Sequence, residues 1–337
     1  MGLDIKDILE YEEISIEKIK GKKIAIDAFN MIYQFLASIR QPDGTPLKDS
    51  KGNVTSHLKG LFNRCVFFKK NNIMPVFVFD GKPPQLKEKE RVLRTERKMK
   101  AETIYRDALE RGDIEEAKKY ASRTSKITSE IVEETKTLIS YFGFPIVQAY
   151  SEGEAEAANL VKKGLVWATA SQDYDSLLFG SKYLIRNLSV GGKRKIPGSN
   201  LYKNASIEFY DLNKNLKKLD LNIDELIILG ILIGTDFNPG GIKGIGPKKA
   251  LKLVKSYRDN WDELFKVIDW YEYFSYSWTE VYNIFKNMKT YYIDSLNFNK
   301  MNKDKIIEFL EKKDFNRESI EKSLNKIKDI KTLDNFF

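Results

Sequence analysis

Two residue types with versatile chemistry are almost absent from this sequence of 337 residues, which contains one cysteine, Cys65, and one histidine, His57. A single cysteine excludes an intrachain disulfide and favours a reducing compartment. A structural zinc site needs about four Cys or His ligands, more than this composition provides. Catalysis by a Ser-His or Cys-His pair would depend on His57 alone, which we interpret as a structural histidine. The chemistry of this protein must therefore use carboxylates, lysines, tyrosines or bound metal.

Long hydrophobic runs are also missing. The longest, at 226–233, is far shorter than the ~20 residues that a membrane-spanning helix needs, and residues 1–6 match neither a secretory nor an N-myristoylation signal. Lys and Arg total 57 against 48 Asp and Glu, a net charge of +9. A lysine-rich proteome would produce the same excess, but a polyanionic partner is the more specific interpretation. We therefore expect nucleic acid rather than a membrane as the partner.

The apolar residues that are present form short runs that predict strands. Runs of β-branched and aromatic residues at 23–26, 76–79, 144–147 and 167–170 alternate with helical patterns. The predicted fold class is α/β, with a mostly parallel central sheet flanked by helices. In such sheets, ligands bind beyond the carboxyl ends of the strands, and here acids follow every one of these runs. One acid at a strand end is an ordinary helix cap, but four strands that all deliver acids to one edge indicate a site.

Seven acids make up this predicted site, six beside the strand ends and one in a later turn: Asp27, Asp80, Glu152, Glu154, Asp173, Asp175 and Asp236. If they converge, their charges repel one another and raise some of their pKa values. Two Mg2+ ions, with Mn2+ as a possible substitute, would relieve the repulsion because hard cations prefer oxygen ligands. Such a pair supports phosphodiester hydrolysis without a histidine.

Each of these acids also has a simpler interpretation. Ser151 and Glu154 fit a helix capping box, Asp173 and Asp175 fit ordinary loop acids, and Asp236 fits a turn cap. Considered individually, most of these acids are better explained by the simpler interpretations. Their recurrence at successive strand ends favours the shared metal site.

A long charged stretch at 82–132 separates two of the strands. It opens with two prolines at 83–84, which block a helix until Gln85. The spacing of the basic residues then puts four of them on one helical face, with most glutamates off that stripe: Lys87, Arg91, Arg94 and Lys98. A solvated surface helix is the alternative to a nucleic-acid-binding face. Further along, the Gly-, Asn- and Lys-rich stretch at 183–212 predicts a loop or hairpin.

A glycine-rich turn follows an apolar helix predicted at 222–233. In this turn, Gly244 and Gly246 let backbone N–H groups approach a phosphate, while Lys248 and Lys249 supply charge. Pro247 suits the first turn of the next helix. The pattern predicts a helix-hairpin-helix at about 224–260 that holds duplex backbone without reading sequence. A plain tight turn is the alternative.

Five motifs together resemble the flap endonuclease family of structure-specific 5′ nucleases, over nearly the whole chain. They are Ile26-Asp27-Ala28, the 78–84 segment around Asp80, Ser151-Glu152-Gly153-Glu154-Ala155, Ser171-Gln172-Asp173-Tyr174-Asp175, and Gly234-Thr235-Asp236 with the glycine turn. All seven acids match the family's metal-binding acids. The resemblance implies Mg2+-dependent flap endonuclease and 5′–3′ exonuclease activity near single-strand/duplex junctions, in replication and repair.

Further residues match the family's DNA-contacting positions. Lys87 and Arg94 match catalytic residues of a helical arch, corresponding to 82–132, that contact the scissile phosphate region. Tyr33 matches an aromatic residue that stacks on a base, and Gly2 matches the start of the chain near the active site. Arg91 and Lys98 are expected to bind DNA along the same stripe. The resemblance implies a single nuclease domain at 1–325 with the arch inserted.

The last residues, 326–337, are predicted to be a separate tail. Leu333, Phe336 and Phe337 resemble the peptide by which replication enzymes dock on the sliding clamp, with Ile330 where the family pattern usually has Gln. The alternative is a tail that folds back on the body. The chain resembles archaeal members, which implies a cytoplasmic protein, and we expect a monomer. The aromatic segment at 270–278 has no functional assignment.

Other functions remain open from the sequence. A related 5′ nuclease that prefers gaps or bubbles would share these acids, although the short arch favours flaps. A non-catalytic branched-DNA binding protein would be expected to lack one or more metal acids, and all seven are present. An RNase with a similar acidic cluster is less favoured because the glycine turn suits duplex backbone.

Overall fold

A mixed sheet forms the centre of the computed structural model, which describes residues 3–188, 193–195, 202–204 and 206–327. The strand order is β1-β9-β6-β5-β2-β3-β4. The strands β2 to β6 all run parallel to one another, while β9 is antiparallel to both β6 and β1. The predicted α/β fold with a mostly parallel sheet is confirmed. The strands are β1 (Glu12–Ile14), β2 (Lys23–Asp27), β3 (Met74–Phe79), β4 (Ile146–Gln148), β5 (Ala168–Ala170), β6 (Tyr183–Arg186) and β9 (Ile207–Asp211).

The loop or hairpin predicted over 183–212 is confirmed as a long hairpin, because its two ends pair antiparallel with each other. Its ends are β6 and β9, and the smaller hairpin β7 (Lys193–Lys195) with β8 (Tyr202–Asn204) lies between them. In β6, Leu184 and Ile185 are fully buried, and four of the five residues of β9 are buried. Burial of these side chains holds both ends of the hairpin in the central sheet.

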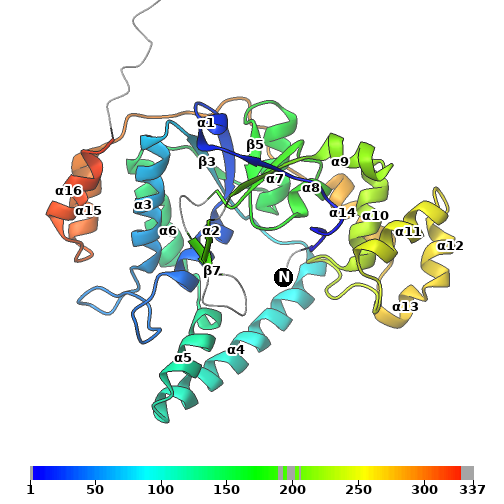
Figure 1. Ribbon diagram of the computed structural model, residues 1–337, viewed down its shortest axis with the longest axis horizontal. Coiled ribbons are helices and arrows are strands. Elements are labelled where there is room, and N and C mark those ends of the chain that lie inside the picture. Colours follow the sequence, from blue (N-terminus) through cyan, green and yellow to red (C-terminus); the bar gives the residue numbers. More distant parts are fainter. Residues whose placement is uncertain (1–2, 189–192, 196–201, 205, 328–337) are drawn as a thin grey trace, which may run out of the picture.

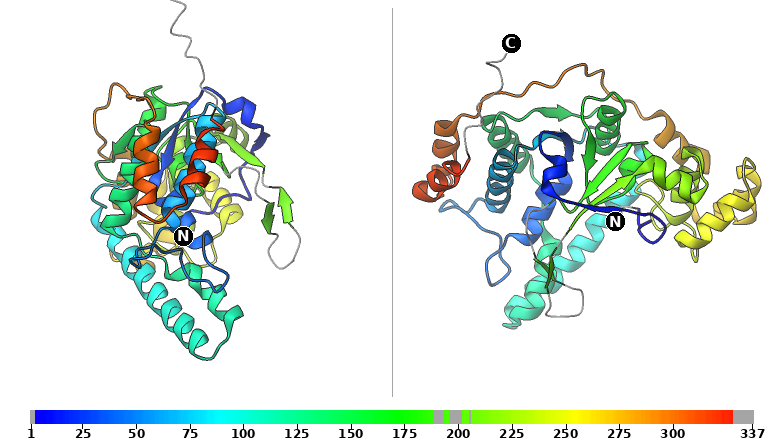
Figure 2. Two further views of the ribbon diagram at one scale, coloured as in Figure 1. Left: turned by 90° about the vertical axis from the view of Figure 1, so that its left-hand side faces the viewer. Right: turned by 45° about the horizontal axis from the view of Figure 1, so that its top comes forward.

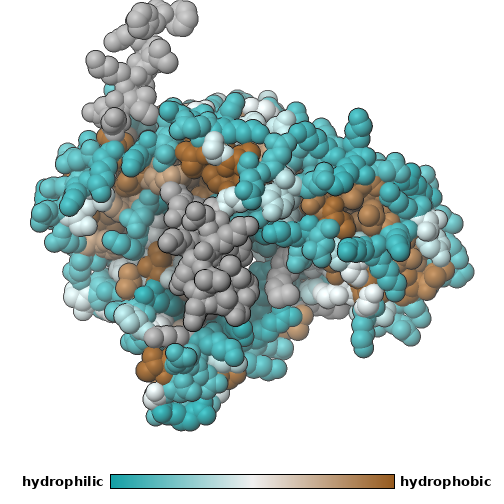
Figure 3. Space-filling view, in the orientation of Figure 1, coloured by the Kyte–Doolittle hydropathy of each residue, from teal (hydrophilic) through white to brown (hydrophobic). Residues whose placement is uncertain are grey.

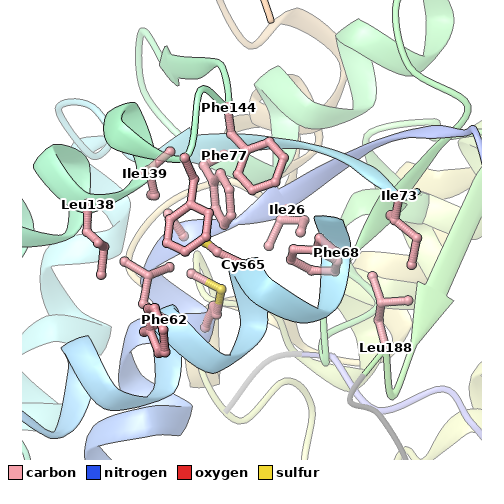
Figure 4. Packing of buried hydrophobic residues seen from close by; sticks show 14 of the residues in the cluster. Ile26, Phe62, Cys65, Phe68, Ile73, Phe77, Leu138, Ile139, Phe144 and Leu188 are labelled. Carbon is pink, nitrogen blue, oxygen red and sulfur yellow. The ribbon is translucent and has the colours of Figure 1, made fainter. Parts of the chain in front are cut away.

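Helices cover both faces of the sheet because alternate strand residues point to opposite sides. On β2, Ile24 and Ile26 belong to one core with α2 (Ala28–Ser38), α3 (Ser56–Lys70) and α6 (Ser129–Tyr141). Ala25, between them, faces a second core with α7 (Gly153–Lys162). Figure 4 shows the first core, where aromatic rings from β3 and α3 pack around Cys65. The layers are visible in Figure 1.

An arch of helices projects from one side of this body (Figures 1 and 2). It consists of a short 3-10 helix at Gln85–Lys87, the long helix α4 (Glu88–Glu110), α5 (Ile114–Ala121) and a second 3-10 helix at Ser122–Thr124. The helical start at Gln85, directly after Pro84, is as predicted. Hydrophilic residues cover most of the arch on the face in Figure 3. Some apolar side chains are nonetheless exposed on the arch, among them Val92, Met99 and Ile114. The chain returns to the body at α6.

A second lobe, built of helices, lies on the right-hand side of Figure 1. Its helices are α8 (Asp175–Leu178), α9 (Leu212–Leu219), α10 (Ile223–Ile233), α11 (Pro247–Ser256), α12 (Trp261–Val267), α13 (Trp270–Tyr273) and α14 (Trp278–Asn287). The predicted helix start at Asn222 is confirmed as a capping box with Glu225. The aromatic segment that had no assignment is a small core: Trp270 is buried, and Phe265 stacks on Trp278 with ring centroids 4.6 Å apart.

The chain then returns across the body to a last pair of helices, α15 (Lys303–Glu311) and α16 (Arg317–Leu324), beside α6. At this junction, buried His57 approaches Glu134 at 3.0 Å through Nε2, and Lys313 pairs with the same carboxylate. His57 is therefore structural, as interpreted from the sequence.

Within the part of the chain that the structure describes, no helix is both long and apolar enough to cross a bilayer.

Candidate active site

The acids of β2 and β3 meet at the carboxyl edge of the sheet. Asp27 is the last residue of β2, and its carboxylate caps α2 by accepting a hydrogen bond from the Asn30 N–H at 3.0 Å. Asp80 directly follows β3 and accepts from the Gly153 N–H at 2.7 Å. Since β2 and β3 are parallel neighbours, with Asp27 opposite Val78, both carboxylates lie at the same edge.

The two glutamates at the start of α7 do not form the capping box considered above. The helix begins after Glu152, which makes no side-chain cap hydrogen bond. The Ser151 hydroxyl donates instead to the carbonyl of Lys82 at 2.8 Å, and Glu154 accepts from the Ser171 hydroxyl at 3.0 Å. The capping-box interpretation is therefore wrong, because the serine joins α7 to the segment before the arch. Neither carboxylate caps the helix.

Two of the remaining three acids follow β5, the parallel neighbour of β2 at the same edge, and the third belongs to the second lobe. Asp173, in the turn after β5, accepts from the Asn30 side-chain amide at 2.9 Å. Asp175 begins α8, and its buried Oδ1 has no hydrogen-bond partner among the described residues. Asp236 lies just beyond α10 and forms ion pairs with two basic residues rather than a turn cap. All seven acids are buried or half-buried.

Burial and mutual repulsion shift the pKa values of these acids. Burial, reinforced by the Asp80 charge, raises the pKa of Asp27 to about 7. Burial, together with Asp236 and Asp173, raises the pKa of Asp175 to about 8. Burial also raises the pKa values of Asp80, Glu152, Glu154 and Asp173. This response is the one expected of carboxylates that a low-dielectric environment crowds together.

Two basic residues from the arch base enter the cluster. The Lys87 ammonium lies 2.5 Å from Glu152 and 3.2 Å from Asp236. Although burial alone would lower its pKa, these two carboxylates raise it, so Lys87 is charged. Arg94 donates to both oxygens of Asp236. Burial would raise the pKa of Asp236, but Lys87 and Arg94 outweigh it and hold this carboxyl below its ordinary value.

The donor set suits hard divalent cations. Its oxygens are carboxylates, and the pKa values of all of them except Asp236 are raised. Asp175 Oδ1 is buried without a partner among the described residues, so a cation would stabilise the charged forms of these groups. As their side chains are placed, no three acid, His or Cys groups in the described ranges form a ready coordination shell. Lys87 and Arg94 occupy oxygens of Glu152 and Asp236 at the same place. Metal binding therefore requires local side-chain rearrangement.

The four basic residues predicted to share one helical face do not form a continuous basic surface. Arg91 pairs with Glu88 at 2.9 Å in solvent, and the Lys98 ammonium donates to the carbonyl of Ser125 across the arch. Glu90 is 3% exposed and pairs with Arg94. The predicted separation of charge by face is thus broken by ion pairs between residues three or four apart. Only two of the four stripe residues reach the acids.

Tyr33 and the predicted DNA-binding residues of the glycine turn lie at the surface, whereas the acids are buried or half-buried. Tyr33 on α2 is 46% exposed. In the turn, Ile242 and Ile245 are buried while Gly244, Gly246, Lys248 and Lys249 are exposed, so the apolar residues anchor the turn and the basic ones face solvent. Gly244 has a φ of +79°, a left-handed conformation that favours glycine. Pro247 is at the start of α11, as predicted. Four other candidates, Gly2, Leu333, Phe336 and Phe337, lie outside the described residues.

Sequence reasoning missed several residues that hold the acids in place. Asn30 joins Asp27 to Asp173 through its backbone and side-chain N–H groups. Gly81 follows Asp80, where a Cβ atom would lie 2.3 Å from the Ala149 carbonyl oxygen, so the backbones of two segments meet there. The spacing of Asn30 three residues after Asp27 was a usable signal, because it fits an N-cap turn. The close approach at Gly81 had no local signal.

Comparison with known proteins places this arrangement among nucleases. Residues 4–101 match the XPG N-terminal domain, and residues 143–236 match the XPG I-region. The chain is 47% identical to Flap endonuclease 1 of Aeropyrum pernix over 331 residues, 97% of this chain and 94% of the relative. It is 55% identical to that of Pyrococcus furiosus over 259 residues, 77% and 76% of the two chains. The solved flap endonuclease-1 of Methanococcus jannaschii has a TM-score of 0.74 at 40% identity, covering 97% of this chain and 98% of that one.

Proposed function

Because this chain belongs to the flap endonuclease family, we propose that it is a structure-specific 5′ flap endonuclease with 5′–3′ exonuclease activity. It hydrolyses DNA phosphodiesters near the junction of single strand and duplex. The observation that carries this proposal is the gathering of seven acids at one sheet edge, with Lys87 and Arg94 reaching them from the arch. A non-catalytic DNA-binding protein would have no use for so many buried carboxylates, which are unfavourable without a counter-charge.

The metal ligands in this proposal are the seven acids, namely Asp27, Asp80, Glu152, Glu154, Asp173, Asp175 and Asp236. They would hold two Mg2+, or Mn2+ as a substitute, and these ions would supply an activated water and stabilise the charge that develops on phosphate oxygens. Support comes from the raised carboxyl pKa values and from the unpartnered oxygen of Asp175. The hydrogen bonds from Asn30, Gly153 and Ser171 keep the acids oriented.

Lys87 and Arg94 have a separate role, which is to position the scissile phosphate. Each now pairs with an acid of the cluster, and a phosphate entering the cleft would compete for both cations. The guanidinium of Arg94 can bind two phosphate oxygens at once, whereas Lys87 acts as a point charge. Binding of the phosphate thereby frees carboxylate oxygens as it becomes oriented for attack. In this way, entry of the substrate phosphate would release carboxylate oxygens of the site for metal binding.

Duplex binding is assigned to the glycine turn and its neighbours. The exposed residues at the start of α11, Gly246, Lys248 and Lys249, suit a DNA phosphate, while buried Ile242 and Ile245 fix the turn to the lobe. Tyr33 is exposed enough to stack on a base near the cut. Arg91 and Lys98 are secondary candidates because both already have partners on the arch. All seven acids come from one chain, so the proposed active unit is a monomer.

Cleavage of 5′ flaps would serve DNA replication and repair, in the cytoplasm of an archaeal cell. For this role we propose that the tail at 326–337 docks on the sliding clamp through Leu333, Phe336 and Phe337. A short helical turn would present these apolar side chains to a pocket on the clamp. A truncation ending at Ile330 should lose clamp binding and clamp stimulation while keeping intrinsic cleavage. Equal stimulation of both proteins would remove the tail from this role.

One experiment tests the central proposal. End-labelled flap, nick, bubble and single-strand substrates are incubated with the full chain and Mg2+, and in parallel with EDTA. We expect cleavage of the flap near its junction in Mg2+ and none in EDTA. Preferred cleavage of bubbles or gaps would assign a different member of the 5′ nuclease class. DNA binding without cleavage in either condition would refute the nuclease function.

A further inference from the structure

Two tyrosines line a cavity beside the segment that precedes the arch. We propose that the cavity lined by Tyr150 and Tyr291 binds single-stranded DNA, taking the bases of a 5′ flap after they pass the active site. This inference rests on the proposed function, since it assigns a contact for the flap that such an enzyme would cut. The cavity measures about 620 Å3 and is bounded by the segment before the arch, the β4–α7 connection and α14.

The two rings are arranged as an accessible aromatic pair. Their centroids lie 5.4 Å apart at 65°, an edge-to-face contact. Tyr150 is 46% exposed and Tyr291 is 49% exposed, so each ring keeps a free surface. A nucleobase can stack on such a surface regardless of its identity, which suits an enzyme that recognises structure rather than sequence.

A buried carboxylate holds one side of this site in place. Glu156, on α7, is completely buried, and its Oε2 accepts a hydrogen bond from the Tyr291 N–H at 3.0 Å. Burial of an acid is unfavourable unless it is hydrogen-bonded, so this contact fixes the backbone of Tyr291 against the body. Nearby, the Lys163 ammonium donates to the carbonyl of Ile293 at 3.4 Å and lies 4.5 Å from the Tyr292 ring centroid. The segment after α14 is therefore tethered at several points.

The polar lining of the cavity suits a nucleic-acid strand. Lys82 and Lys289 line it and are exposed, and neither forms an ion pair with a carboxylate in the described parts of the chain. Both are available to phosphates at the rim. Asn287, whose amide donates to Asn283 at 3.2 Å, adds hydrogen-bonding groups. The one acid in the lining, Glu280, accepts a hydrogen bond from the Ser277 N–H as part of a helix cap.

The position of the cavity fits the path of a flap. Lys82, at its rim, precedes the arch by a few residues, and Ser151, also in the lining, is adjacent to the site acid Glu152. The hydroxyl of Ser151 donates to the Lys82 carbonyl, so the two boundaries are joined. In the left view of Figure 2, the segment after α14 and the β7–β8 hairpin lie on opposite sides of the molecule. A strand that enters beside the hairpin and passes under the arch would emerge near the tyrosines.

Flap length provides the test. Two substrates share the same duplex arms, one with a one-nucleotide flap and one with a flap of about 15 nucleotides. We expect the double variant Tyr150→Ala/Tyr291→Ala to lower kcat/KM on the long flap by about tenfold relative to wild type. Its kcat/KM on the short flap should be unchanged. The double variant Tyr150→Phe/Tyr291→Phe keeps both rings and should retain the wild-type ratio, as should Tyr271→Ala, which removes a tyrosine that is 71% exposed on α13.

The outcomes separate this inference from the proposed function. Wild-type protein that cuts neither flap would refute the nuclease function itself. Wild-type protein that cuts both, with an Ala variant that has the same long-to-short ratio, would overturn the inference and leave the nuclease function intact. That result would assign the two rings to another occupant, such as a protein segment. Equal losses on both flaps would overturn it as well, because a flap contact must depend on flap length.

Discussion

Arg94 donates from Nη2 to both carboxylate oxygens of Asp236 at 3.0 Å, across 142 positions of sequence. The arginine is on the arch and the aspartate follows α10 in the second lobe, so this contact joins two separate parts of the molecule. The same guanidinium donates from Nε to Glu90 at 2.7 Å, which fixes its direction. The base of the arch is thus held to the acids that we assign to metal binding.

The first prediction concerns this arginine. Arg94→Ala should slow cleavage of a flap by roughly 100-fold, because the scissile phosphate loses its positioning group, while weakening DNA binding much less. Arg94→Lys should recover only part of the rate, since a lysine cannot bind two phosphate oxygens in a fork. Single-turnover rates and binding constants measured on one substrate would test this. If Ala and Lys variants lose binding and rate in equal, small proportion, Arg94 is a solvated surface residue.

The second prediction concerns the metal acids. Asp80→Ala and Asp173→Ala should each reduce cleavage to near background and leave binding to a flap substrate largely intact, because these acids hold metal rather than DNA. Cleavage at several Mg2+ and Mn2+ concentrations should fail to restore the wild-type rate. Asp294→Ala, at an exposed site after α14, is the matched control and should cleave normally. Near-normal rates in both site variants would exclude the assignment.

The third prediction concerns duplex binding. Lys248→Ala should weaken binding to duplex-containing substrates and reduce the slope of log K against log salt by about 1, as expected when one phosphate contact is lost. Lys217→Ala removes an exposed lysine from α9 and should change neither quantity. Fluorescence anisotropy over a salt series measures both. An unchanged slope in the Lys248 variant would favour the plain-turn interpretation.

The fourth prediction concerns pH in the absence of metal. Burial, Asp236 and Asp173 raise the pKa of Asp175 from 3.8 to about 8. Between these values the folded chain retains a proton that the unfolded chain has released, so unfolding free energy falls as pH rises through this window, by at most about 1.4 kcal/mol per pH unit for one such group. Asp27 contributes in the same direction, through a pKa of about 7.

Asp175→Asn removes one of these titrating groups. In EDTA, the variant should be more stable than wild type at pH above about 8, by about 1 kcal/mol or more, and the difference should shrink toward acidic pH. Its flap cleavage should nevertheless be lost. Thermal unfolding across the pH range measures the effect, with Asp294→Asn as control. A wild-type melting temperature that rises from pH 5 to about 8 in EDTA would contradict the sign.

Much of the candidate site was predictable because its signals are local. Asp27 and Asp80 directly end or follow hydrophobic strand runs, and the parallel arrangement of those strands brings their ends to one edge. The helix starts at Gln85, Asn222 and Pro247 follow from proline and capping rules that act within a turn. The prediction failed where a distant partner decided the outcome. The Ser151 hydroxyl donates to the Lys82 carbonyl rather than capping α7.

The sequence by itself determined the chemistry. With one histidine and one cysteine, it restricted catalysis to carboxylates, lysines, tyrosines and metal. Its motifs predicted seven metal-binding acids and identified the family. Only the tertiary structure decided which charges meet: Lys87 and Arg94 reach the acids, whereas Arg91 and Lys98 of the same basic stripe do not. It also placed Tyr150 beside Tyr291. The physical reason is that helical periodicity fixes a residue's face, while the element packed against that face is set by burial of side chains far away in the chain.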